Sequence, residues 1–115
     1  STNKDPSVRA DAAHFYAAAG QLERALSELA KLEKLSKTKF VSSFGLAIIC
    51  VGIRDDGRAF GYFEKAVQEH TDMLVYLNVD SRFDRIRSDP RFADLLRRVG
   101  LLQKFTPRRY RKRRA

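Results

Sequence analysis

The chain has 115 residues, of which 43% are hydrophobic and 32% are charged, and its formal net charge is +9. This composition is typical of a soluble globular domain and excludes collagen-like and low-complexity classes. The longest apolar run, residues 44–53, is about half the ~20 residues that a membrane-spanning helix requires, and no segment is organised as a secretory signal. Cys50 is the only cysteine, which excludes an internal disulfide and a cysteine-rich zinc site. We therefore expect a cytoplasmic protein that does not enter the membrane.

The positive charge is concentrated at one end of the chain. Residues 104–115 contain seven lysines and arginines and no acidic residue. Subtracting these seven charges from the net charge of +9 leaves +2 for residues 1–103, so the body is nearly neutral. We expect residues 104–115 to form a disordered basic tail that follows one folded domain over residues 1–103.

Two helical hairpins are predicted in the first part of the chain. Asp5 and Pro6 form a cap-then-proline helix start, and Gly20 suits the left-handed position that ends a helix. Leucines spaced by three and four residues then predict a second, amphipathic helix over residues 22–35, joined by a loop of about two residues. Residues 40–53 and 58–69 repeat this arrangement, with Asp55 and Asp56 as caps between them.

A closing element follows over residues 72–103. Short helices are predicted over residues 73–79 and 81–87, the second capped by Asp80. Asp89 and Pro90 start a last helix, which Gly100 is expected to close. The arginines of this element alternate with aspartates, which predicts local ion pairs on a solvated face.

The two hairpins are related by an internal repeat. Residues 24–32 read RALSELAKL and residues 58–66 read RAFGYFEKA, so Ala25 and Ala59 correspond at an offset of 34 residues. The same offset pairs Ala13 with Ala47, which are both small, and Leu29 with Phe63, which are both large and apolar. It also pairs the apolar residues Ala12 and Leu46, which differ in size. This predicts two tandem units, over residues 6–37 and 40–71. Gly45, Gly52 and Gly61 weaken the second unit's helices, so we expect close helix contacts or irregularity there.

This repeat resembles the tetratricopeptide repeat. The family's small residue falls on Ala13 and Ala47, its aromatic residue on Tyr16, and one of its alanines on Ala25 and Ala59. Its bulky residue falls on Leu29 and Phe63. Two positions depart from the family pattern: Cys50 stands at the aromatic position of the second unit, and Leu32 stands at another alanine position of the first. Residues 74–101 resemble the closing element of many bacterial tetratricopeptide proteins. The resemblance implies an all-α fold in which antiparallel helical hairpins stack as a short right-handed solenoid with a helical C-terminal cap. It also implies that the chain is the C-terminal part of a larger protein.

In the tetratricopeptide family, one face of each unit's first helix lines a concave groove. Mapped by position, the candidate peptide-binding residues are His14, Ala17, Val41, Phe44, Ile48 and Val51. An open groove would accept an amphipathic helix or an extended peptide. The alternative is that the closing helices fold back and cover this face. The family's clamp for acidic chaperone tails requires lysine, asparagine and arginine on this face, and these are absent.

Catalytic chemistry has little support in the sequence. His14 and His70 are the only histidines, and their separation matches no metal-ligand spacing. Cys50 falls on a core position, and the aspartates are explained as helix caps. We therefore predict no catalytic residue, metal or cofactor.

Three hypotheses for function remain open. The first is a protein-interaction scaffold that recognises a protein or peptide. The second is a nucleic-acid-associated protein whose tail residues neutralise phosphates while Tyr110 stacks on a base. Its candidate residues are Arg108, Arg109, Tyr110, Arg111, Lys112, Arg113 and Arg114. The third is self-association through the surface that a preceding repeat would cover. The sequence leaves the oligomeric state undetermined.

Overall fold

The fold consists of helices and the turns between them. The computed structural model describes residues 5–69, 74 and 76–100, and no strand occurs within them. The elements are α1 (Pro6–Ala18), α2 (Leu22–Leu35), α3 (Ser43–Gly52), α4 (Asp56–Gln68), the 3₁₀ helix η2 (Ser81–Ile86) and α5 (Pro90–Arg98). The all-α prediction is therefore confirmed for the described residues. The predicted tail over residues 104–115 and part of the predicted helix over residues 73–79 lie outside them.

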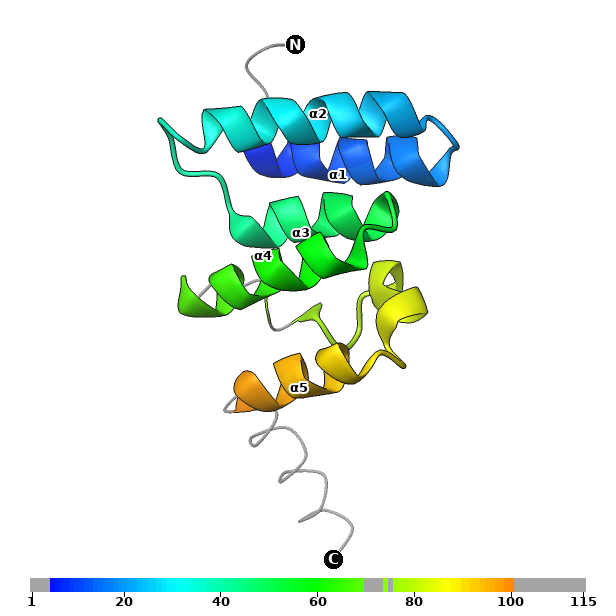
Figure 1. Ribbon diagram of the computed structural model, residues 1–115, viewed down its shortest axis with the longest axis vertical. Coiled ribbons are helices and arrows are strands. Elements are labelled where there is room, and N and C mark those ends of the chain that lie inside the picture. The colour runs from blue at the N-terminus through cyan, green and yellow to red at the C-terminus, as the bar shows by residue number, and fades with distance from the viewer. Residues whose placement is uncertain (1–4, 70–73, 75, 101–115) are drawn as a thin grey trace, which may run out of the picture.

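The helices are arranged in successive layers (Figure 1). α1 and α2 form an antiparallel pair, α3 and α4 form a second pair beside it, and η2 and α5 lie beyond the second pair. α3 is the central element, because it contacts α1, α2, α4 and η2, while α5 packs on α4. This position explains why nearly the whole surface of α3 is buried, as its uniformly apolar sequence predicts.

The turns within the two hairpins have the same structure. The backbone N–H of Gly20 donates to Ala17 O at 3.1 Å and that of Gln21 donates to Tyr16 O at 2.8 Å. Thirty-four residues later, the N–H groups of residues 54 and 55 donate to the carbonyls of residues 51 and 50 at 3.1 and 2.9 Å. The helices that flank the turns share this offset: α1 ends at residue 18 and α3 at 52, and α2 begins at residue 22 and α4 at 56. The predicted repeat is therefore a repeat of hairpin structure.

Most of the predicted helix starts are confirmed. The carboxylate of Asp55 accepts from the N–H of Arg58 at 3.2 Å at the start of α4. Asp80 caps η2 and Asp89 caps α5 in the same way, and Pro90 occupies the first turn of α5. Gly100 directly follows Val99, the C-cap of α5, as predicted for a glycine at a helix end, but it lacks the left-handed backbone that Gly20 has after α1.

Three aromatic rings join the second hairpin to the closing element. Phe44 of α3, Phe63 of α4 and Phe83 of η2 are buried, and their ring centroids lie 5.5–5.9 Å apart in edge-to-face arrangements. Such pairs contribute about 0.5–1.5 kcal/mol each beyond the burial of their area. The closing element is therefore held to the hairpins by core packing.

Glycines allow α3 to approach α1 closely. A methyl group added at Gly45 would lie 3.3 Å from Cβ of Ala10, and one at Gly52 would lie 3.0 Å from Cδ2 of His14. The predicted close contact is thus confirmed at these two positions. At Gly61 an added methyl group would meet no atom within 4 Å, so the prediction is wrong there.

Arginines of the closing element form two kinds of ion pair. Arg87 and Asp84, Arg91 and Asp89, and Arg97 and Asp94 are local pairs, as predicted. The prediction of local pairing alone is wrong, however, because three arginines also reach distant elements. Their long-range partners are Asp11 for Arg82, Asp56 for Arg85 and Glu64 for Arg98. Local spacing could not reveal these pairs, because they depend on how η2 and α5 fold back on the hairpins.

Candidate functional site

The predicted groove residues of the second hairpin are not on an open surface. Val41, Phe44, Ile48 and Val51 are at most 7% exposed. The ridge that includes positions 44, 48 and 51 faces the closing element, since Phe44 packs against Phe83. The ridge of Phe44, Ile48 and Val51 is therefore buried and not an open groove, with Phe83 of η2 packed on Phe44. Val41 is also buried, but it lies in the connector that precedes α3 and not on this ridge.

The predicted groove residues of the first hairpin lie at the contact between α1 and α3. His14 and Ala17 are half-buried, and both face Gly52 at contact distance. Burial and the nearby guanidinium of Arg82 lower the pKa of His14 below its usual value of 6.5. This imidazole is therefore neutral at physiological pH and has the surroundings of a packing residue.

Arg82 bridges the edge of this region. Its guanidinium donates to Asp11 Oδ1 of α1 at 2.8 Å and to Asp80 Oδ2 at 2.7 Å. The hydrogen bonds from Arg82 lower the pKa of Asp80. η2 is thus tied to α1 as well as to α3.

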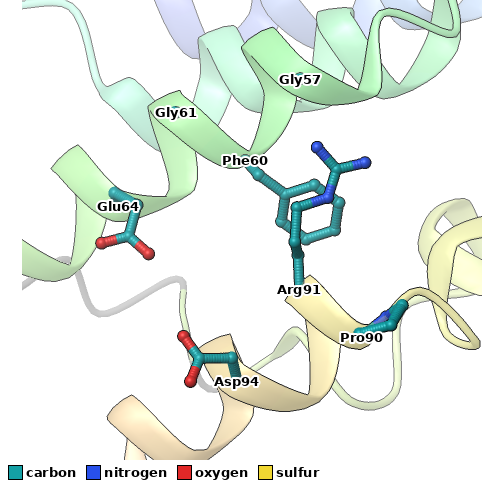
Figure 2. Close-up of a pocket in the computed structure, with 7 residues that line it drawn as sticks. All are labelled: Gly57, Phe60, Gly61, Glu64, Pro90, Arg91 and Asp94. Atoms are coloured by element: carbon teal, nitrogen blue, oxygen red, sulfur yellow. The ribbon is translucent and has the colours of Figure 1, made fainter.

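A groove of about 420 Å³ lies between α4 and α5. Figure 2 shows Arg91 reaching from α5 across the ring of Phe60, while Glu64 and Asp94 extend into the space between the two helices. The Arg91 guanidinium carbon lies 4.7 Å from the Phe60 ring centroid, within cation–π distance. Gly57 and Gly61 also line the groove on α4 and contribute no side chain to it, so Phe60 and Glu64 are the α4 side chains that line it.

The charged groups in this groove are already paired. Arg91 donates to both carboxylate oxygens of Asp89, and Asp94 accepts from Arg97 at 2.7 Å. Glu64 accepts from Arg98. Phe60 is only 6% exposed. The groove therefore presents neither an unpaired charge nor a broad apolar floor that would select a ligand.

The outer face of α1 is the most conspicuous exposed apolar surface of the first hairpin. Val8 and Phe15 are seven residues apart, so they share one face of the helix, and they are 50% and 67% exposed. Ala12 lies between them on the same face. We call Val8, Ala12 and Phe15 the α1 outer face.

The corresponding face of α3 is covered. At the 34-residue offset Phe15 corresponds to Ile49, which is fully buried on the side of α3 that also carries Gly45 and Gly52. Those glycines pack against Ala10 and His14 of α1. α3 therefore uses this face to contact the preceding hairpin, whereas α1 presents the equivalent face to solvent.

The structure gives Cys50 the properties of a core residue. Its side chain is fully buried, and burial raises the pKa of the thiol to about 12, so the thiolate is not formed at neutral pH. Within residues 5–69, 74 and 76–100, no cluster of three metal-ligating side chains occurs, and no helix has the length and apolar character needed to cross a bilayer.

Comparison with protein-family models, curated proteins and solved structures gives no match to this chain.

The interpretation of the sequence expected a surface that a preceding repeat would cover but did not name its residues, and it did not identify the exposed connector between the hairpins. The α1 outer face could have been found from the repeat itself, because position 15 aligns with Ile49 in a fully apolar helix. The connector between the hairpins carries Phe40 at 74% exposure, although the sequence analysis placed this residue inside a helix. The apolar run of residues 40–53 concealed that the helix begins only at Ser43.

Proposed function

We propose that this chain is a non-catalytic protein-interaction module built from tetratricopeptide-like hairpins, and that a partner docks on the α1 outer face. The observation that carries the proposal is the contrast between Phe15 and Ile49. These two residues occupy equivalent positions of the repeat, yet Ile49 is buried and Phe15 is 67% exposed. Repeat units of this kind bury a continuous core by stacking on their neighbours, so the α1 outer face is suited to one further helical hairpin.

The docking chemistry follows from the residues present. Val8 and Phe15 offer an aliphatic and an aromatic side chain with the small Ala12 between them, which allows a helix to approach closely. Aromatic residues, phenylalanine among them, are enriched in the buried cores of protein interfaces. The expected partner is therefore a helical hairpin with apolar residues at helical spacing.

The test compares proteins captured by the wild-type chain with those captured by Phe15→Asp and Val79→Asp variants. Both positions are at least 67% exposed, so both variants are expected to fold with wild-type stability. A docked partner should be lost with Phe15→Asp and retained with Val79→Asp. Sedimentation of the purified chain at two concentrations then shows whether the docked hairpin belongs to a second copy. An identical set of captured proteins for wild type and Phe15→Asp, together with no self-association, would rule out this face.

A nucleic-acid-associated function is the second candidate, and the distribution of charge favours it. The net charge of +2 over residues 1–103 leaves the seven positive charges of residues 104–115 as the main electrostatic feature. Deletion of residues 104–115 should abolish binding to single-stranded oligonucleotides. Seven phosphate contacts would give a salt dependence with a slope of up to about −5 in a double-logarithmic plot. Binding that survives the deletion with an unchanged slope would exclude the tail as the contact.

A further inference from the structure

A second hollow lies between the two hairpins, where the chain crosses from α2 to α3. It has a volume of about 380 Å³ and is formed by the end of α2, the connector over residues 36–42, the start of α3 and the last turns of α4. We call it the connector hollow. It lies apart from the groove between α4 and α5, with which it shares no lining residue.

The connector hollow combines an apolar interior with an exposed aromatic side chain. Val41 and Leu46 are 7% and 3% exposed, and Tyr62 is half-buried beside them. Phe40 is 74% exposed at the edge, so most of its ring has no cover from the described residues. An apolar side chain entering the hollow would therefore bury surface of Phe40 that is otherwise in contact with water.

The two carboxylates in the lining are occupied by donors of the chain itself. Glu33 accepts from the guanidinium of Arg58 and from the hydroxyl of Tyr62. Burial and the bond to Glu33 raise the pKa of Tyr62 to about 12, so this hydroxyl keeps its proton and remains a donor. Glu69 accepts from Ser43 Oγ at 2.6 Å and from the Ser43 N–H at 3.3 Å.

The lysines in the lining have no such partners. Lys37, Lys39 and Lys65 are exposed and form no ion pair or side-chain hydrogen bond with any residue that the structure describes. Their three positive charges exceed the two negative charges of Glu33 and Glu69, and Arg58 adds a fourth positive charge beside Glu33. The edge of the hollow is therefore positive, and its ammonium groups are available to a ligand.

The backbone of the connector is already ordered for such contacts. The N–H of Lys37 donates to Lys34 O at 3.2 Å, and the N–H of Lys39 donates to Leu35 O at 3.0 Å. The Thr38 hydroxyl also donates to Leu35 O, at 3.3 Å. Because these bonds fix the turn, the two lysine backbones lose little further freedom when a ligand binds.

We propose that the connector hollow binds an acidic peptide segment whose apolar side chain enters beside Phe40 and whose carboxylates pair with Lys37, Lys39 and Lys65. The basic tail of this chain is excluded as the occupant, because it has the same sign of charge as the lysines. A peptide is favoured over a nucleic acid because the interior is apolar and Phe40 is exposed at its edge, so an apolar side chain of a peptide gains burial there that a phosphate backbone cannot provide. The site goes beyond the proposed docking on the α1 outer face, shares no residue with it, and stands or fails separately.

The experiment uses the full chain and short labelled peptides that alternate glutamate with leucine, glutamate with serine, or lysine with leucine. Binding is measured by fluorescence anisotropy, and amide shifts in two-dimensional NMR spectra locate the contact. The glutamate–leucine peptide should bind most tightly and shift the amides of residues 36–46 and 62–69. The Lys39→Glu/Lys65→Glu double variant should raise the Kd about tenfold or more. Lys31→Glu and Lys34→Glu are combined as the matched control, since they change the charge equally at two lysines outside the lining, and this control should change the Kd less than about twofold.

Each of the following four results would overturn the proposal. Equal binding of the glutamate–leucine and glutamate–serine peptides would show that no apolar side chain enters the hollow. Equal loss in the test and control double variants would show a general charge effect. An oligothymidine that competes for the same amides and loses affinity in the Lys39→Glu/Lys65→Glu variant would identify the lysines as a nucleic-acid contact. Absence of any amide shift at about 1 mM peptide would show that the hollow does not bind this class of ligand.

Discussion

Gly20 and Arg54 occupy the same position in two turns that lie 34 residues apart, and both have a left-handed backbone. Their φ angles are 84° and 65°, and Arg54 is the only described non-glycine residue with a positive φ. Each follows a helix whose last carbonyls it helps to satisfy. The first turn thus has the residue that this conformation favours, while the second holds an arginine in a conformation that costs a residue with a Cβ atom roughly 1–2 kcal/mol.

Because Arg54 has a left-handed backbone that favours glycine, replacing it with glycine and replacing Gly20 with alanine should change the free energy of unfolding in opposite directions. Arg54→Gly should raise the free energy of unfolding by about 0.5–1 kcal/mol, because it relieves the left-handed strain and removes an exposed side chain that forms no hydrogen bond or ion pair with the described residues. Gly20→Ala should lower it by about 1 kcal/mol, although an added methyl group there meets no atom within 4 Å. Urea denaturation measures both. If Arg54→Gly is destabilising, the turn is not strained.

The helical glycines give a second pair of opposite expectations. Gly61→Ala should stabilise the chain by about 0.5–1 kcal/mol, since the helix propensity improves and the new methyl group enters open space. Gly52→Ala should destabilise it by about 1 kcal/mol or more, because its methyl group would lie 3.0 Å from His14 Cδ2 and 3.2 Å from Ala17 Cβ. Thermal unfolding of the two variants distinguishes these cases. Equal effects would mean that α1 and α3 are not in close contact.

The features predicted correctly from the sequence are local ones. The caps at Asp55, Asp80 and Asp89 and the left-handed Gly20 depend on a few neighbouring residues, so single segments specify them. The left-handed conformation of Arg54 was not predicted, although the 34-residue offset from Gly20 indicates it.

The features predicted incorrectly depend on long-range folding. Phe44 is buried because Phe83 packs on it from 39 residues away in sequence, and the ion pair of Arg82 with Asp11 spans 71 residues. Helical periodicity assigned positions 44, 48 and 51 to one ridge and left two alternatives, an open groove or a face covered by the closing helices. The choice between them depends on how η2 packs, which periodicity does not determine. The exposure of Phe15 and Phe40 likewise depends on which neighbours fold against them, although the 34-residue offset from Ile49 already indicates the face of α1 to which Phe15 belongs.

The surroundings of His14 predict a loss of stability in mildly acidic solution. Burial and Arg82 lower the folded-state pKa of His14, so the unfolded chain binds more protons as the pH falls past 6.5. The contribution of neutral His14 is therefore complete above about pH 6.5 and declines as the pH falls towards the lowered pKa. His14→Gln should flatten the dependence of unfolding free energy on pH in this window. His70→Gln provides the comparison for the other histidine, and an unchanged slope in His14→Gln would contradict the expectation.

The ion pair of Arg85 with Asp56 predicts measurable coupling between the closing element and the second hairpin. Its two hydrogen bonds of 2.7 and 3.1 Å join the guanidinium to both carboxylate oxygens, and Arg85 also donates to Val51 O at 3.1 Å. This bidentate geometry should give a coupling of about 1 kcal/mol in a double-mutant cycle with Arg85→Ala and Asp56→Ala.

The local pair of Arg97 with Asp94 is the matched control for that cycle. Its side chains are 72% and 52% exposed, against 34% and 27% for Arg85 and Asp56, so its coupling should stay below about 0.5 kcal/mol. The hydrogen bond from Arg85 lowers the pKa of Asp56 below 3.8, so the coupling should persist at neutral pH and disappear as the pH falls through that lowered pKa. A coupling for Arg85 and Asp56 as small as that expected for the control pair would mean that Arg85 does not tether η2 to α4, and that the aromatic contact of Phe83 with Phe44 and Phe63 holds the closing element without it.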